Sequence, residues 1–427
     1  FLYDSSLHYH IHNLTKKSVV QLLSEFRRMG SSIVFADRNK AIIKTSKTSI
    51  ENSYAYGQYL ISSIRSKPLF NLLEINVVRY WDILVWMDKY NFAGSFTWDV
   101  SDSTTIEGNK ENMSEVDENG ENRTDKNKLE YVSKWQIKNY LPIILHEEFE
   151  DWVLVILDAL IQEREKQYLG DKEGNGPTQK RATQITQILM QKKTFEDEVD
   201  LEKIHKEGLC SQFRKPLIKR INNLIKKQAE MVRDPEMIAE YQFPVLAGSH
   251  LKLTNPTLEL VKYLCQILSL SKRRNMEVRL LRRDLLKLFA IMEFSEEGIF
   301  KNPSTSLVIP EVICDTCFQI RDIDICKDDE QQLWHCPNCE SEYNKLIIEE
   351  RLIFEFNKLL VQYFTQDLKC NKCGEMRSDE LSSHCSCSGK WVSTVNIKDI
   401  IRQFKIFANV SDAYQFGLLR QVVSDVI

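Results

Sequence analysis

Eight of the eleven cysteines lie in two tight clusters near the C-terminal end of the sequence. Each cluster consists of two short pairs, with eighteen residues between the pairs in the first cluster and eleven in the second. Such pairs are typical of metal knuckles rather than of a disulfide framework, and they favour a reducing compartment, the nucleus or the cytosol. The clustered residues are Cys314, Cys317, Cys336 and Cys339, and then Cys370, Cys373, Cys385 and Cys387.

Both sets of four thiolates predict a structural metal site. Four cysteine sulfurs close a tetrahedral zinc site and leave no open position for catalysis. The alternative for the first set is four free buried cysteines. For the second set zinc is again predicted, but four cysteines can instead hold a [4Fe–4S] cluster, and the spacing does not decide between them. For the first set the substitute ligands to exclude are Cys326 and His335, and for the second set His384 is a fifth candidate ligand.

Three histidines, His8, His10 and His12, alternate along the chain near its start. In an extended strand they would line one side, as a metal triad requires. The competing interpretation is an ordinary polar strand face, because no acidic or cysteine residues stand close by.

Two clusters of basic residues could contact phosphates or an acidic partner. The competing interpretation is a solvated helix face, since no aromatic residues alternate with the cations as they do in single-strand binding platforms. The clusters are Lys215, Lys219, Lys226 and Lys227, and then Lys272, Arg273, Arg274, Arg279, Arg282 and Arg283.

The composition describes a folded protein of helices and strands. The chain has 427 residues, of which 43% are hydrophobic and 28% charged, enough for two to four domains. Its net charge of −4 argues against coating by nucleic acid.

Apolar runs in the sequence are too short to span a bilayer, and no Walker A loop, dinucleotide fingerprint or nucleophile elbow is present. A start at Phe1 without an apolar leader favours a fragment of a longer protein.

Apolar periodicity predicts the elements that must carry these residues. The N-terminal part reads as a helix over 14–29 and a β-hairpin over 33–43, then a core region with a strand at 72–78 and a helix at 80–90. Helical patterns follow over 129–168, 182–233, 257–270 and 276–292, and a long helix over 345–368 precedes further C-terminal helices. Because that long helix is apolar on more than one side, we expect burial on two sides, either by a stable partner or by neighbouring helices.

The hairpin tip carries a single acid, Asp37, beside Arg38 and Asn39. A tip of this kind can present carboxylates to metal ions, so it is either an ordinary turn or a disabled active site.

Together, the hairpin and the paired cysteine sets resemble the C-terminal half of the DNA polymerase epsilon catalytic subunits, in a form similar to those of budding yeasts. In active B-family polymerases the hairpin tip reads Tyr-Gly-Asp-Thr-Asp-Ser, and its two aspartates help to hold magnesium ions. The resemblance implies that Asp37 matches the first acid, whereas Arg38, Asn39 and Lys40 replace the threonine, second acid and serine. It therefore implies a non-catalytic fragment of a nucleotidyltransferase.

The resemblance also implies a fold class and a set of partners. The expected fold is α+β and mostly helical, with a degenerate palm and thumb, two zinc modules and C-terminal helices. The implied partners are the B subunit, which has a calcineurin-like phosphoesterase fold, and the GINS-containing CMG helicase, in the nucleus and without a membrane. Alternatives are a zinc-dependent DNA-binding module that uses the basic helices and a weakly active polymerase. The expected domains are an inactive palm at 1–100, a disordered acidic insertion at 101–128, a thumb-like region at 129–300, a first zinc module at 301–344, a connecting helix at 345–369, a second cysteine module at 370–392 and C-terminal helices at 393–427.

Overall fold

A computed structural model describes most of the chain and divides it into two compact units. Unit 1 comprises 1–84 and 94–132, and unit 2 comprises 85–93 and 133–427. The expected insertion at 101–128 and the residues Arg38, Asn39, Lys272 and Arg273 lie outside the described residues. The described residues are 5–37, 40–47, 50–99, 130–170, 209–231, 240–271, 274–378 and 382–426.

Unit 1 begins with the predicted helix and hairpin. Helix α1 (Ser5–Arg28) ends just before Gly30, whose φ of 89° is the left-handed conformation that stops a helix. Strands β1 (Ser32–Ala36) and β2 (Ala41–Lys44) pair antiparallel, which confirms the hairpin. Helix α2 (Ile50–Arg65) follows, and its Leu60 and Ile64 are buried with Phe26 in the core of this unit.

The prediction for 72–90 was wrong. Residues 72–78 form no regular element, and the expected helix at 80–90 is the strand β3 (Arg79–Asp88). Its aromatic and β-branched residues favour a strand, and a two-residue turn joins it to β4 (Asn91–Asp99). With β5 (Glu130–Trp135) they form a sheet in the order β3-β4-β5, so the expected helical region at 129–168 begins with a strand.

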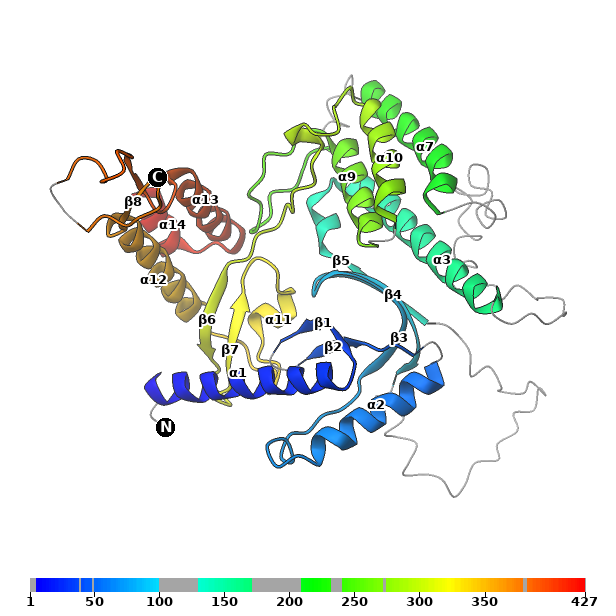
Figure 1. Ribbon diagram of the computed structural model, residues 1–427. Helices are drawn as coiled ribbons and strands as arrows, with labels where there is room; N and C mark the ends of the chain where they lie inside the picture. The colour runs from blue at the N-terminus through cyan, green and yellow to red at the C-terminus, as the bar shows by residue number, and fades with distance from the viewer. Residues whose placement is uncertain are drawn as a thin grey trace. The chain divides into compact units, whose positions relative to one another are not determined.

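Helices dominate the first half of unit 2 (Figure 1). They are α3 (His146–Gly170), α7 (Leu209–Met231), α9 (Pro256–Ser269) and α10 (Asn275–Lys287). Short 3-10 helices at Gln136–Tyr140, Ile143–Leu145 and Glu296–Gly298 complete this half. Between α3 and α7, Arg220 contacts Glu148 through both carboxylate oxygens, and Trp152 donates to the same carboxylate.

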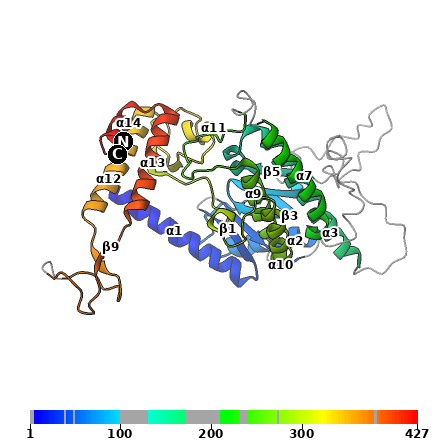
Figure 2. The ribbon, with the colours of Figure 1, turned by 90° about the horizontal axis from the view of Figure 1, so that it is seen from above.

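The second half of unit 2 is a mixed layer of short strands and helices. Its elements are β6 (Val308–Ile313), β7 (Ile320–Asp324), α11 (Glu330–Trp334), α12 (Lys345–Phe364), β8 (Leu368–Cys370), β9 (Trp391–Ser393), α13 (Ile397–Tyr414) and α14 (Gly417–Ser424). Strand β6 pairs with β7, and β8 with β9, both antiparallel. Figure 2 shows β9 and the loops around it beyond the ends of α12 and α13. The molecule is therefore a mixed helix and strand protein, as expected.

A single core joins α12 to the C-terminal helices. Phe356 of α12 is fully buried, and its ring centroid lies 5.0 Å from that of Phe404 and 5.3 Å from that of Phe407. Neighbouring helices of this chain bury only one side of α12, so they do not supply the second buried side, and its burial by a partner stays a prediction. Phe354 is 59% exposed and Phe364 78% exposed on the uncovered side.

Candidate metal centres

The first four cysteines converge at one point in unit 2. Two come from the loop between β6 and β7, and two follow α11. The sulfur of Cys314 lies 3.5 Å from that of Cys339, and the sulfur of Cys317 lies 3.5 Å from that of Cys336. All four sulfurs lie within 4.8 Å of one another, so the structure brings together the predicted set.

The second four cysteines converge in the same way beyond α12. The sulfurs of Cys370 and Cys387 are 3.3 Å apart, and those of Cys373 and Cys385 are 3.5 Å apart. Again all four lie within 4.8 Å of one another. This set is more open than the first, because Cys373 and Cys387 are exposed.

One backbone pattern builds all three Cys-x2-Cys knuckles. The carbonyl of the first cysteine accepts from the residue after the second cysteine, as from Phe318 to Cys314 at 2.9 Å. The N–H of the first cysteine donates to the next residue along, as from Cys336 to Ser341 at 2.9 Å. The Cys-x-Cys knuckle keeps both bonds in a loop one residue shorter, with Ser388 donating to Cys385 at 2.8 Å. The unusual spacing is thus a shortened form of the same knuckle.

Every knuckle places a left-handed residue directly after its second cysteine. The φ values are 57° at Phe318, 57° at Glu340, 75° at Gly374 and 59° at Ser388. This conformation costs a non-glycine residue about 1–2 kcal/mol. Three of the four turns carry that cost, and a metal bound by the sulfurs would offset it.

Gly389 is needed for space rather than for backbone freedom. A Cβ at this position would lie 2.3 Å from the sulfur of Cys370 and 3.2 Å from that of Cys387. A non-bonded contact of 2.3 Å is far shorter than those of real Cβ atoms, so only glycine lets the shortened knuckle approach the Cys370 sulfur. Gly374, by contrast, has open space around it and supplies the positive φ.

The electrostatics of each quartet favour an added cation. Burial raises the pKa of Cys314, but hydrogen bonds from the Ser341 hydroxyl and from backbone N–H groups outweigh burial and lower it to about 6. The pKa of Cys370 is also lowered to about 6, mainly by the N–H of Cys373. For Cys373, the hydrogen bond from the N–H of Glu375 lowers the pKa, but the neighbouring thiols together have the larger effect. The net result is a pKa raised to about 12. Four sulfurs this close cannot all ionise unless a cation neutralises them.

The donor sets fit a single tetrahedral ion. Four thiolates at about 2.3 Å from zinc are about 3.8 Å apart. Two sulfur pairs in each quartet are 3.3–3.5 Å apart, and all four sulfurs lie within 4.8 Å of one another. The two quartets therefore fit two metal sites. All ligands would be thiolates with no open position, so such sites serve structure rather than catalysis.

The substitute ligands lie outside both quartets. Cys326 is buried, and burial first, then the charge of Asp324, raises its pKa to about 12. His335 and His384 are exposed and belong to neither group.

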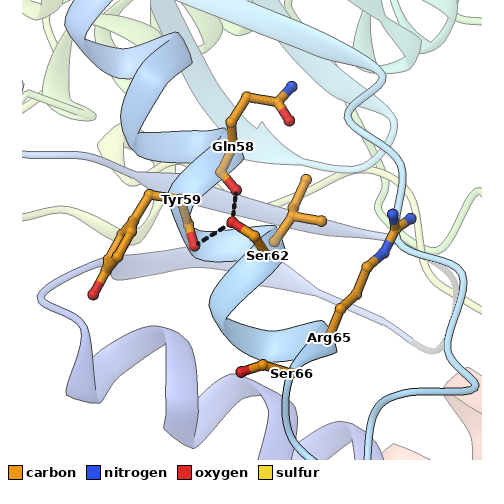
Figure 3. Close-up of a pocket in the computed structure, with 6 residues that line it drawn as sticks. Gln58, Tyr59, Ser62, Arg65 and Ser66 are labelled. Atoms are coloured by element: carbon orange, nitrogen blue, oxygen red, sulfur yellow. Dashed lines mark hydrogen bonds between the residues drawn. The ribbon is translucent and has the colours of Figure 1, made fainter.

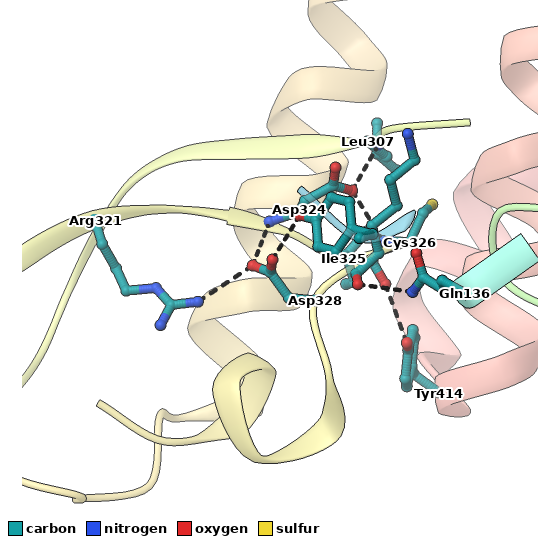
Figure 4. Close-up of polar contacts among 10 residues, drawn as sticks. Gln136, Leu307, Arg321, Asp324, Ile325, Cys326, Asp328 and Tyr414 are labelled. Atoms are coloured by element: carbon teal, nitrogen blue, oxygen red, sulfur yellow. Dashed lines mark hydrogen bonds and ion pairs between the residues drawn. The ribbon is translucent and has the colours of Figure 1, made fainter. Parts of the chain in front are cut away.

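A polar network, which the sequence did not reveal, holds the loop that contains Cys326 (Figure 4). The Asp324 carboxylate accepts from the N–H of Cys326 at 3.2 Å, and Asp328 accepts from the N–H of Asp324 at 2.9 Å. Tyr90 donates to Asp328 at 2.8 Å, and Tyr414 donates to the carbonyl of Ile325 at 3.0 Å. The network connects the strands of the first module to α13 and to the turn after β3.

Within the part of the chain that the structure describes, the remaining predicted candidates form no third metal site. His8, His10 and His12 fall within α1, so the extended strand that the triad required is not formed. The strand-based metal triad was therefore wrong. Asp37 closes its own turn, accepting from the N–H of Lys40 at 2.7 Å.

A surface hollow of about 570 Å³ lies on α2 (Figure 3). Its lining is largely engaged within the protein. Ser62 donates to the carbonyl of Gln58 at 2.6 Å, and Arg65 donates to the carbonyl of Ile75 at 3.0 Å. The hollow therefore presents no converging set of chemical groups.

The basic helices are partly neutralised within unit 2. Arg214 pairs with Asp284, and Arg279 pairs with Glu293. The predicted lysines of α7 are exposed. Among the described helices, none is long and apolar enough to cross a membrane.

Comparison with protein families gives three matches. Residues 1–95 match the "Domain of unknown function (DUF1744)". Residues 297–362 and 364–421 each match a "Zinc finger domain of DNA polymerase-epsilon". Each zinc finger match contains one cysteine quartet, which supports zinc as the metal.

Curated relatives extend the similarity to the whole chain. The DNA polymerase epsilon catalytic subunit of Debaryomyces hansenii is 46% identical over 100% of this chain, and that of Saccharomyces cerevisiae is 40% identical over 100%. The corresponding protein of Yarrowia lipolytica is 31% identical over 98%. The chain spans only 18% of the length of each of these relatives.

Proposed function

Since this chain belongs to the family of DNA polymerase epsilon catalytic subunits, we propose that it is a non-catalytic scaffold of the leading-strand replicase in the nucleus. Its task would be to link the polymerase to the GINS-containing CMG helicase and to bind the B subunit. The observation that carries this proposal is the exposed apolar side of α12, which lies between the two cysteine modules.

The metal in both modules is proposed to be Zn²⁺. Two sulfur pairs 3.3–3.5 Å apart in each quartet, with all four sulfurs within 4.8 Å, suit one ion per quartet. A [4Fe–4S] cluster places an iron ion in front of each thiolate and so holds the sulfurs further apart. Metal analysis of anaerobically purified protein should find two zinc ions per chain and no visible absorption. Iron with a broad visible band would contradict this assignment.

The palm hairpin is proposed to be inert. Asp37 is the only acid of the tip, and its carboxylate accepts from the Lys40 N–H at 2.7 Å within the turn. A two-metal site needs carboxylates that bridge both ions. We expect no magnesium-dependent nucleotide incorporation by this chain. Incorporation that Asp37→Ala abolishes would instead support a working polymerase.

The proposed partner surface is the α12 face, defined by four exposed apolar residues. Helical spacing places these side chains within one broad stripe. Their exposed fractions are large for apolar residues, and an uncovered stripe of this kind marks an interaction site. The residues are Leu346 at 63%, Phe354 at 59%, Val361 at 59% and Phe364 at 78%.

Co-purification with the B subunit tests the proposal. Phe354→Asp with Phe364→Asp should abolish the complex while zinc content stays at two, because the change lies on the outer side of α12. Leu72→Asp is a matched control, since Leu72 is 94% exposed and lies in unit 1. Cys336→Ser with Cys339→Ser should also abolish the complex, by unfolding the first module. Full binding by either double variant would refute the proposal.

DNA binding through α7 is the second candidate function. It is favoured by the exposure of Lys215, Lys226 and Lys227 on one helix. Such binding should weaken steeply with salt, and replacing these three lysines by glutamate should abolish it. Salt-independent binding would exclude this role.

A further inference from the structure

Ser341 contacts three of the four cysteines in the first quartet. Its hydroxyl oxygen lies 3.1 Å from the sulfur of Cys314 and 3.0 Å from the sulfur of Cys339. Its carbonyl accepts from the N–H of Cys336 at 2.9 Å. A single O–H group thus lies between a sulfur of its own knuckle and a sulfur of the facing knuckle.

Glu375 occupies the same place in the second quartet. Like Ser341, it stands two residues after the second cysteine of a Cys-x2-Cys knuckle, and its carbonyl accepts from the N–H of Cys370 at 2.9 Å. Its carboxylate oxygen Oε2 lies 3.9 Å from the sulfurs of Cys373 and Cys385. These two are also a sulfur of its own knuckle and one of the facing knuckle.

The two side chains have opposite effects on metal-bound thiolates. A hydroxyl donates a hydrogen bond and stabilises negative sulfur, whereas an ionised carboxylate can only accept and repels it. A carboxylate oxygen is also a zinc ligand in its own right, so Glu375 can replace a sulfur that leaves the ion.

The two quartets also differ in how accessible their sulfurs are to solvent. In the first quartet no cysteine is exposed, but in the second Cys373 and Cys387 are exposed. Water and small chelators therefore reach the second set of sulfurs more easily.

We infer that the two metal centres differ in permanence: Ser341 is a positioning residue that locks the first ion in place, and Glu375 makes the second ion exchangeable. This inference rests on the proposed occupation of both quartets by metal. It gives the chain one fixed centre, within the core that supports α12, and one centre that can lose and regain its ion.

Release of zinc from the full 427-residue chain to a chromophoric chelator tests the inference. The wild type should release two ions in two phases. Cys373→Ser with Cys387→Ser should remove the fast phase and so assign it to the second centre. Ser341→Ala should accelerate the slow phase about 10- to 100-fold, the usual effect of losing a partner of a metal ligand. Glu375→Ser should slow the fast phase.

Conservative variants separate positioning from general stability. Ser341→Thr keeps the hydroxyl and should restore slow release, and Ser306→Ala, at an exposed serine before β6, should change neither phase. In the cobalt-substituted protein, Ser341→Ala should shift the thiolate-to-cobalt absorption of the slow centre, which a purely structural effect would not do. Release of both ions in one phase, or an unchanged slow phase in Ser341→Ala, would overturn the inference. Binding of fewer than two ions by the wild type would refute the proposed occupation instead.

Discussion

Gly389→Ala should selectively damage the second metal centre. The new methyl group would lie 2.3 Å from the Cys370 sulfur and 3.2 Å from the Cys387 sulfur, both of them proposed ligands. Because the carbonyl of Gly389 also accepts from the N–H of Cys385 at 3.0 Å, the turn cannot withdraw without breaking its own closure. Overpacking of this kind costs about 1–3 kcal/mol. Every 1.4 kcal/mol is about tenfold in affinity, so zinc should bind the second centre roughly one to two decades more weakly.

Competition with a chelator of known affinity measures this loss, and the slowly released ion serves as an internal reference. Gly417→Ala is the matched control, because nothing lies within 4 Å of a Cβ there and the residue starts α14. It should leave both affinities unchanged. If Gly389→Ala bound two zinc ions as tightly as the wild type, the assigned packing of this knuckle would be refuted.

Four further results are expected. Arg220→Leu leaves the Glu148 side chain, which is 8% exposed, without its cation, and should cost about 3 kcal/mol in urea unfolding. Tyr90→Phe removes the donor to Asp328 and should cost about 1.5 kcal/mol in the same assay. Burial chiefly lowers the pKa of His250, so the unfolded chain takes up its proton first and the wild type should lose stability as pH falls below about 6.5. His250→Gln should lose less over that range in urea titrations at pH 5.5 and 7.5. Serine variants of the first quartet should raise amide hydrogen exchange in α12, whereas those of the second should not.

Sequence patterns correctly predicted the features that depend on interactions within a few residues. The knuckles, the hairpin and Gly30 follow from turn and metal chemistry within a few residues, and the structure places them as expected. The alternation of His8, His10 and His12 suggested a strand, but these residues lie in a helix. The long helical periodicity of the segment outweighs a short alternating run. The apolar residues of β3 also fit a helical period, which led to the wrong prediction, although its aromatic and β-branched residues and its pairing with β4 favour the strand.

The contacts that tune the metal sites depend on tertiary structure. Ser341 and Glu375 stand at matching places in their knuckles, and this is visible in the sequence once the knuckle pattern is known. Their effect is not visible, because each acts on a sulfur of the facing knuckle. The spacing rule could therefore find the ligands but not the residues that tune them.

The two modules differ in how they connect to the rest of unit 2, and this difference bears on the scaffold role. Cys314 and Cys336 belong to the same buried core as Phe356 of α12 and Phe407 of α13. Removing the first ion would leave close thiols inside that core and loosen the helix that carries the proposed partner surface. Among the described residues, β8, β9 and short connections join the second module to the helices, and its cysteines are absent from this core. An exchangeable ion can therefore be tolerated there, because its loss unfolds a peripheral loop and leaves α12 in place.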